Sequence, residues 1–224
     1  MSYSTSVGDV PAKAAEAVLA ASRSAIAERG TFSVAISGGS LPKLLAAGLT
    51  HAQLPLDKWN VFLADERIVP LTDDDSNFRL VKQYFPDMHV VPIDPTLSPP
   101  ECARDYQRKI VDKLGEAPVF DAVLLGLGPD GHTCSLFPGH ELLDETDNIV
   151  APISNSPKPP PKRVTLTLPV LGAARAAMFI CTGAGKAGVV KDILQNTDSK
   201  LPGALVRTAG PVQWFLDEGA AGEL

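Results

Sequence analysis

Short apolar, β-branched runs alternate with segments of helical periodicity along most of this chain. The first pair sets the pattern. Pro11–Arg29 carries apolar residues at helical spacing, ends at Gly30, and is followed by the strand-like run Thr31–Ser37. The other expected strands are Asn60–Ala64, His89–Ile93, Ala122–Gly126, Arg163–Leu168, Met178–Thr182 and Val212–Leu216, and the other expected helices are Pro42–Thr50, Ser76–Tyr84, Pro100–Leu114, Leu136–Leu143 and Lys186–Gln195. Such alternation predicts βαβ units, and so an α/β fold with a mainly parallel sheet and helices on both faces.

The bulk composition is that of one globular domain, and the net charge limits the kinds of partner that the protein can bind. The chain has 224 residues, 45% of them hydrophobic and 21% charged, which predicts a single domain over residues 1–224 with a full apolar core. A net charge of -6 gives no global field that would draw the protein onto nucleic acid or anionic lipid. Any anion that it binds must therefore be held by a local group of cations.

The cysteines and the hydropathy predict a cytoplasmic protein. The three cysteines are odd in number and far apart, which argues against a disulfide framework and against a four-cysteine zinc site. The N-terminal segment lacks the basic and apolar regions of a secretory signal, and no apolar run is long enough to span a membrane. We expect a monomer or a weak homo-oligomer that acts on a small molecule.

In an open parallel sheet, ligands bind beyond the carboxyl ends of the strands, so the loops at those ends carry the functional interest. One of them reads SGGSLPK, with Gly38, Gly39 and Ser40 between a strand and a helix start. Glycine lets the backbone approach an anion, and the N-terminus of a helix offers unpaired N–H groups. Phosphate binding and a plain tight turn with Ser40 as N-cap are equally compatible with this segment.

The run ADER places ionisable residues at the end of another strand. Asp65 and Arg67 lie there, and Asn77 follows at the next expected helix start. This placement favours a binding mouth, while a surface ion pair between Asp65 and Arg67 is the alternative.

The strongest signal is GLGPDGH, in which an apolar strand runs into a glycine-rich turn that carries Asp130 and His132. Histidine is the natural general base near neutral pH, and a nearby carboxylate can orient it. The alternative is a turn in which Asp130 caps its own backbone and His132 is incidental.

Two further cations are Arg163, where the chain enters an expected strand, and Lys186, just after the glycine turn that follows another; each alone would be an ordinary surface charge. Together they could hold a phosphoryl group in an acidic protein. No histidine or cysteine spacing is typical of a metal site, so no metal is expected. The proline-rich stretch Ser154–Lys162 predicts an extended exposed loop, with a ligand for an SH3 domain as the less favoured interpretation.

These motifs together resemble a known family. SGGSLPKLL, ADERIVPLTDDDSN, LLGLGPDGHTCSLFPGH and PPPKRVTLTLP stand in the order seen in 6-phosphogluconolactonases, and the resemblance extends along nearly the whole chain. It implies a Rossmann-like three-layer sandwich and hydrolysis of 6-phospho-D-glucono-1,5-lactone in the oxidative pentose phosphate pathway, without a cofactor.

The resemblance also implies residue roles. His132 resembles the general base that activates water, with Asp130 orienting it or holding the substrate. The Gly38–Gly39 backbone and Ser40, with Arg163 and Lys186, resemble the phosphate-binding group of the family. Arg67 resembles a substrate-binding cation, on the phosphate or on the oxyanion. Asp65 is expected to contact sugar hydroxyls, and Asn77 lines the same site.

Two alternatives stay open from the sequence. Amino-sugar phosphate deaminases/isomerases share the glycine-rich turn, the DE pair and the DGH turn, but carry an acidic residue soon after DGH, where this chain reads SLFPGH. A non-catalytic sugar-phosphate sensor of the same fold would have no need of a His132–Asp130 pair. Both comparisons favour the lactonase.

Overall fold

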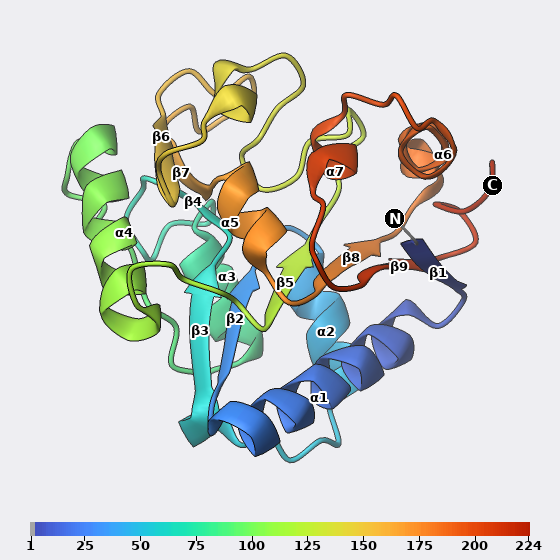
Figure 1. The fold of residues 1–224 in the computed structure, drawn as a ribbon, viewed down its shortest axis with the longest axis horizontal. Helices are drawn as coiled ribbons and strands as arrows, with labels where there is room; N and C mark the ends of the chain where they lie inside the picture. The colour runs from blue at the N-terminus through green and yellow to red at the C-terminus, as the bar shows by residue number, and fades with distance from the viewer. Residues whose placement is uncertain (1–2) are drawn as a thin grey trace.

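A six-stranded parallel sheet forms the centre of the protein, whose computed structural model describes residues 3–224 (Figure 1). All five strand pairings are parallel. In spatial order the strands are β1 (Tyr3–Val7), β9 (Val212–Leu216), β8 (Ala177–Cys181), β5 (Ala122–Leu125), β2 (Phe32–Ile36) and β3 (Trp59–Leu63). The four inner strands β9, β8, β5 and β2 are almost wholly buried, as a sheet covered on both faces requires.

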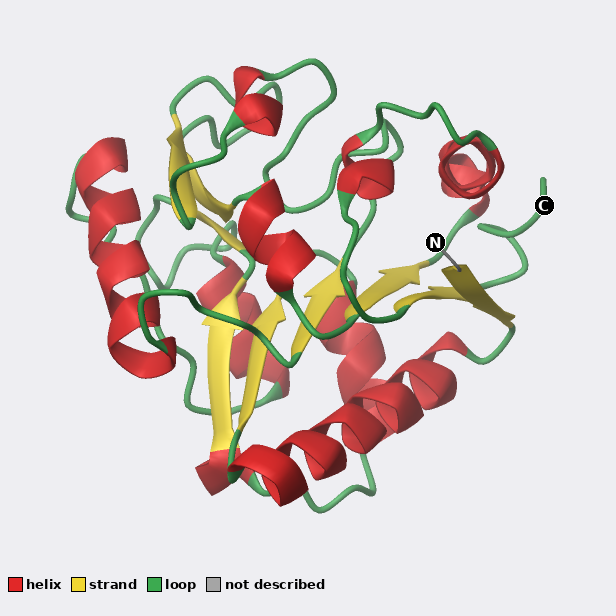
Figure 2. Cartoon of the chain, in the orientation of Figure 1, coloured by secondary structure: helices red, strands yellow, loops and turns green. Residues whose placement is uncertain are grey.

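Helices cover both faces of this sheet, which makes the three layers that the sequence predicts (Figure 2). Three helices lie together on one face of the sheet, below and behind the strands in Figure 1: α1 (Val10–Arg29), α2 (Leu41–Leu49) and α3 (Asn77–Tyr84). The other side carries α5 (Leu168–Ala173), α6 (Ala187–Gln195) and α7 (Pro202–Leu205). The predicted α/β fold is confirmed, and Gly30 ends α1 in the left-handed conformation expected of it, with φ of 81°.

A second, smaller sheet lies beside the carboxyl end of β3. It is antiparallel and contains β4 (Asp65–Arg67), β7 (Arg163–Leu166) and β6 (Val150–Ile153), with α4 (Pro99–Leu114) packed against it. The strand predicted over Arg163–Leu168 therefore exists, but it belongs to this sheet and not to the parallel one. The sequence predicts neither β4 nor β6, since both are short and follow no clear alternation.

Two predicted elements are wrong, and proline explains both. His89–Ile93 forms only a single bridge between Val61 and Val90, because Pro92 has no N–H to continue the ladder. The helix predicted over Leu136–Leu143 is absent, because Pro138 and Gly139 turn the chain and leave one 3₁₀ turn, Glu141–Asp144. Strand β1 was also missed, and residues 1 and 2 of the predicted domain lie outside the described residues.

The strand order places a topological switch point between β2 and β5. The chain leaves β2 for β3 on one side, while β5 and β8 pair on the other side. Loops after neighbouring strands therefore diverge at this point and leave room between them, which is where open α/β sheets bind ligands. The two glycine-rich motifs of the sequence follow these two strands.

Candidate active site

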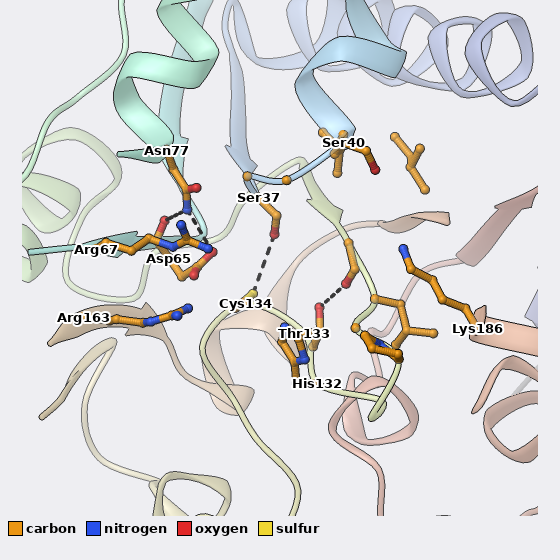
Figure 3. Close-up of a pocket in the computed structure, with 18 residues that line it drawn as sticks. Ser37, Ser40, Asp65, Arg67, Asn77, His132, Thr133, Cys134, Arg163 and Lys186 are labelled. Atoms are coloured by element: carbon orange, nitrogen blue, oxygen red, sulfur yellow. Dashed lines mark hydrogen bonds between the residues drawn. The ribbon is translucent and has the colours of Figure 1, made fainter. Parts of the chain in front are cut away.

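A cavity of about 250 Å³ opens at this switch point (Figure 3). The turn after β2 and the turn after β5 form its walls, with further side chains from β4, α3, β7 and the segment after β8. In Figure 3, Ser40 and Lys186 lie on one side of the cavity, and Arg67, Asp65, Asn77 and Arg163 lie on the other. His132 lies between these two groups.

The turn after β2 presents an anion-binding arrangement. Gly39 has φ of 67°, and Ser40 stands at the N-cap of α2, where its side chain makes no capping hydrogen bond. The nine-residue helix α2 thus directs its first N–H groups and the exposed Ser40 hydroxyl toward the cavity side of the turn. Ser40 therefore stands at the N-cap position, but its side chain does not form the capping hydrogen bond that the plain-turn interpretation expects. Lys186 adds a cation from the 3₁₀ turn Ala184–Lys186.

The wall formed by β4 and α3 is held by buried polar groups. The carboxylate of Asp65 is buried, and it accepts hydrogen bonds from Ser135 Oγ at 2.8 Å and from Asn77 Nδ2 at 3.4 Å. Asn77 packs so closely on Gly38 that a β-carbon there would lie 1.8 Å from its Oδ1. The surface ion pair considered for Asp65 and Arg67 does not occur among the salt bridges of residues 3–224.

Arg67 and Arg163 stand directly opposite each other on β4 and β7. Like charges in such a pair repel each other unless an anion lies near them. Arg67 Nη1 donates to Asp75 O at 2.9 Å, whereas its buried Nε has no partner within residues 3–224. Burial first, and then the positive charge of Arg67, lower the pKa of Arg163. The two guanidinium groups therefore make this side of the cavity suited to bind an anion.

The guanidinium of Arg163 also anchors the proline-rich loop. Its Nε donates to Pro160 O at 2.9 Å, and its Nη2 donates to the carbonyl oxygens of Lys158 at 2.9 Å and Pro159 at 3.0 Å. Nη1 donates to Ser135 Oγ at 3.3 Å. Four of the five N–H donors are thus engaged, and one remains for a ligand. The predicted contact of Arg163 with phosphate stays a prediction, alongside this structural role.

The turn after β5 presents the histidine. Gly131 has φ of 82°, Gly128 N donates to His132 O at 2.8 Å, and Thr133 Oγ1 donates to Gly126 O at 2.8 Å. The ring of His132 stacks on Phe137 with centroids 4.8 Å apart. A hydrogen bond joins its Nδ1 to Asp130 Oδ1, the same oxygen that accepts from His132 N at 3.4 Å. Asp130 therefore both caps its own turn and orients the imidazole.

The electrostatics of this pair suit a general base. Burial lowers the pKa of His132, and the nearby ammonium of Lys158 lowers it too, although Asp130 acts in the opposite direction. Burial alone would raise the pKa of Asp130, but hydrogen bonds with His132 and Lys158 and the charge of His132 outweigh it and bring this pKa to about 2. Near neutral pH the pair is therefore a neutral imidazole beside an ionised carboxylate.

The structure brings the predicted site residues together. Nine of the ten line the cavity: Gly38, Gly39, Ser40, Asp65, Arg67, Asn77, His132, Arg163 and Lys186. The tenth, Asp130, is hydrogen-bonded to His132. Sequence reasoning missed Lys158, whose Nζ lies 3.2 Å from Asp130 Oδ1 and 3.1 Å from His132 Nδ1. No sequence signal marks it, because it belongs to the proline-rich loop, 28 and 26 positions after these partners.

Ser135 is not placed as a nucleophile. Its hydroxyl is fully buried and donates to Asp65 Oδ2, while it accepts from Arg163. The histidine beside it pairs with Asp130 and not with this hydroxyl. Within residues 3–224, no group of three or more His, Cys, Asp or Glu side chains is arranged to hold a metal ion, and no helix is both long and apolar enough to cross a membrane.

Fold and site together define a class of protein: a three-layer α/β sandwich with a cation-lined cavity and a histidine–aspartate pair at the topological switch point. The family model described as glucosamine-6-phosphate isomerases/6-phosphogluconolactonase matches residues 6–214. The chain belongs to this family.

Named relatives lie on the lactonase side of the family. The chain is 48% identical to 6-phosphogluconolactonase of Rattus norvegicus over 207 residues, which are 86% of this chain and 80% of that protein. It is 44% identical to the Bos taurus 6-phosphogluconolactonase, over 99% of this chain and 92% of the relative. A solved structure of 6-phosphogluconolactonase from Trypanosoma brucei superimposes with a TM-score of 0.87 at 31% identity and covers 100% of this chain and 99% of its own. The resemblance stated from the sequence is confirmed.

Proposed function

We propose that this chain hydrolyses 6-phospho-D-glucono-1,5-lactone to 6-phospho-D-gluconate, the lactone hydrolysis of the oxidative pentose phosphate pathway. The observation that carries the proposal is His132, paired with Asp130 and lying between Lys186 on one side of the cavity and Arg67 and Arg163 on the other, in a chain whose relatives are named 6-phosphogluconolactonases. A cavity of about 250 Å³ fits a sugar-sized ligand, and the cations fit its phosphate.

The reaction follows from the tautomer of His132. Because Nδ1 faces Asp130, Nε2 is the unprotonated nitrogen and takes a proton from water as the oxygen attacks the lactone carbonyl. The tetrahedral intermediate then expels the ring oxygen, which receives the proton from the imidazolium, and the new carboxyl group releases a proton to solvent. A lactone is already electrophilic, so this step needs no covalent nucleophile, metal or cofactor.

The substrate groups are assigned from the two sides of the cavity. The phosphate is placed at the Gly38–Gly39–Ser40 turn with Lys186, where N–H groups, a hydroxyl and an ammonium meet. Arg67, whose Nε–H has no partner within residues 3–224, and Arg163 face the substrate from the other side. Asp65 and Asn77 border the sugar hydroxyls on that side.

The deaminase/isomerase alternative loses support from the cavity itself. Such enzymes carry an acidic residue soon after the DGH turn, but the first carboxylate after this turn, Glu141, is exposed and does not line the cavity. Among the described residues that line the cavity, Asp65 is the one carboxylate. We also propose a cytoplasmic protein, monomeric or weakly homo-oligomeric, without nucleic-acid or membrane partners; cell fractionation and sedimentation velocity test these points.

The test is proton release near neutral pH on freshly generated 6-phosphogluconolactone. We expect the wild type to exceed the spontaneous rate strongly, and His132→Ala to lose about 10²–10⁴-fold in kcat, the contribution of a general base. His51→Ala, at an exposed histidine outside the cavity, is the matched control and keeps its activity. In the same assay, Lys186→Met raises KM more than it lowers kcat.

The possible failures separate the claims. Wild-type protein without activity on the lactone refutes the function, and ammonia release from glucosamine-6-phosphate would then favour the deaminase. A fully active His132→Ala variant refutes the assignment of the base but leaves the substrate in place.

A further inference from the structure

Lys158 makes contacts that the reaction described above does not use. Its Nζ lies 3.2 Å from Asp130 Oδ1, 3.1 Å from Asp130 Oδ2 and 3.1 Å from His132 Nδ1. Lys158 does not line the cavity, so it approaches the pair from outside while His132 faces the substrate. An ammonium in this place touches the base and its carboxylate at once.

Hydrogen bonds to the backbone of the proline-rich loop hold Lys158 in this position. The buried guanidinium of Arg163 binds three consecutive carbonyl groups, those of Lys158, Pro159 and Pro160. Ser156 closes the other end, since its hydroxyl donates to Lys158 O at 2.9 Å and its N–H donates to Pro161 O at 3.1 Å. The backbone of Lys158 is thus fixed from both sides, in a segment that the sequence predicts only as an extended loop.

Chemistry decides which contact of Lys158 dominates. An ammonium can only donate, and Nδ1 cannot accept from Lys158 while its own proton is directed at Asp130. The Nδ1–Asp130 contact is the closer of the two, so Nδ1 keeps its proton and Lys158 binds both carboxylate oxygens. The contact of Lys158 with the imidazole is then one of charge, which disfavours imidazolium.

We propose that Lys158 is a positioning residue for the His132 base: held by the Arg163-anchored loop, it fixes the Asp130 carboxylate against Nδ1 and keeps the imidazole in its neutral, proton-accepting form. This inference rests on the proposed lactonase function. A carboxylate alone favours the protonated imidazole, and the ammonium of Lys158 offsets this effect while Asp130 still orients the ring through Nδ1.

The other charges around His132 do not replace Lys158. Asp130 and Asp65 both favour the protonated ring, and Lys158 acts against them. Lys186 and the two arginines line the same cavity from other elements, and within residues 3–224 no hydrogen bond or salt bridge joins them to His132 or Asp130. Phe137, stacked on the ring, is uncharged. Within the part of the chain that the structure describes, Lys158 is therefore the cation in contact with this pair.

The experiment compares Lys158→Met, which keeps the length of the side chain and removes its charge, with Lys158→Arg and with Lys162→Met. Lys162 is exposed in the same loop and serves as the matched control. Two quantities are measured on each full-length protein: the pH dependence of kcat/KM for the lactone, and the titration of His132 followed by NMR, which needs no substrate.

For Lys158→Met we expect the acidic limb of the kcat/KM profile to move up by about half a pH unit to one unit, because a cation next to the ring is lost. The activity loss is then several-fold larger at pH 6 than at pH 8. The NMR titration of His132 moves in the same direction, Lys158→Arg restores both, and Lys162→Met leaves both unchanged.

Two results overturn the proposal. One is an unchanged His132 titration and an unchanged profile in Lys158→Met. The other is a loss of activity by the same factor at every pH with an unchanged titration, since that places Lys158 in some other role. A wild type without lactonase activity refutes the proposed function instead, while the NMR titration still tests the contact between Lys158 and His132.

Discussion

Gly128 shows how closely single residues define this site. The imidazole of His132 lies where a side chain on Gly128 would start: a β-carbon there would be 1.9 Å from Nδ1 and 2.6 Å from Asp130 Oδ1. The glycine is therefore required by the ring and the carboxylate, not by a turn conformation. The GLGPDGH motif is thus a packing unit as well as a sequence signal, in which the first residues make room for the last.

Gly128→Ala is expected to lower kcat/KM by about 10²-fold or more, because the new methyl group pushes the imidazole off Asp130 and displaces the proposed general base. The turn itself can persist, so the circular dichroism spectrum stays that of the wild type. Gly188→Ala, at an exposed position in α6 where a β-carbon would meet only an ordinary contact at 3.8 Å from Glu223 Oε1 among the described residues, is the control and keeps full activity. An alanine variant at Gly128 with normal kcat/KM would show that His132 functions in another position.

At the scale of elements, β4 and α3 are joined by one buried carboxylate. Glu66 is fully buried, and its oxygens accept hydrogen bonds from the N–H groups of Arg67, Asn77 and Phe78 and from the hydroxyl of Ser76. Burial raises the pKa of Glu66 to about 7, against the effect of the three N–H donors. Through its hydrogen bonds with the N–H groups of Arg67 and Asn77, the carboxylate of Glu66 holds both residues at the cavity.

Glu66→Gln is expected to destabilise the protein by about 1–3 kcal/mol, because the amide brings N–H groups to a position where four donors already point. The measurement is the urea concentration at the midpoint of unfolding at pH 8, where Glu66 is ionised in most wild-type molecules. Glu116→Gln, at an exposed glutamate, controls for the loss of charge. An unchanged midpoint in Glu66→Gln would mean that the carboxylate does not hold this turn.

The helices and strands differ in whether neighbouring residues in the sequence or contacts with distant residues determine them. Apart from β1, the parallel strands and most long helices follow periodicity and capping, so their positions could be predicted to within a residue or two. Strand β4 could not, because Asp65–Arg67 forms a strand only through its pairing with β7 from a distant part of the chain. The site residues on strand ends were predictable as a set, while Lys158 was not, since only the Arg163-anchored loop brings it to His132.

At the scale of the whole molecule, α4 ties the two sheets together. The Tyr106 hydroxyl accepts from Leu63 N at 2.7 Å and donates to Leu63 O at 3.1 Å at the end of β3. Gln107 accepts from the N–H groups of Ile149 and Val150 at 3.0 Å and 3.2 Å, on the side of β6. Adjacent residues of one helix thus satisfy the backbone of both sheets, and we propose that the whole chain is one domain.

One domain predicts one cooperative unfolding unit, and the proposed active site requires it, since β4 and β7 supply one side of the cavity and the parallel sheet supplies the rest. We expect the amide of Leu166, bonded to Ala64 O at 2.8 Å, to exchange through the same global opening as that of Ala177, bonded to Pro211 O at 3.1 Å. Hydrogen exchange over a series of denaturant concentrations measures both opening free energies. If the amide of Leu166 exchanges through an opening of lower free energy that does not depend on denaturant, the small sheet is a separate unit. Arg67 and Arg163 can then leave the cavity without global unfolding. If both amides share one opening, the cations and the base are held by the same cooperative core.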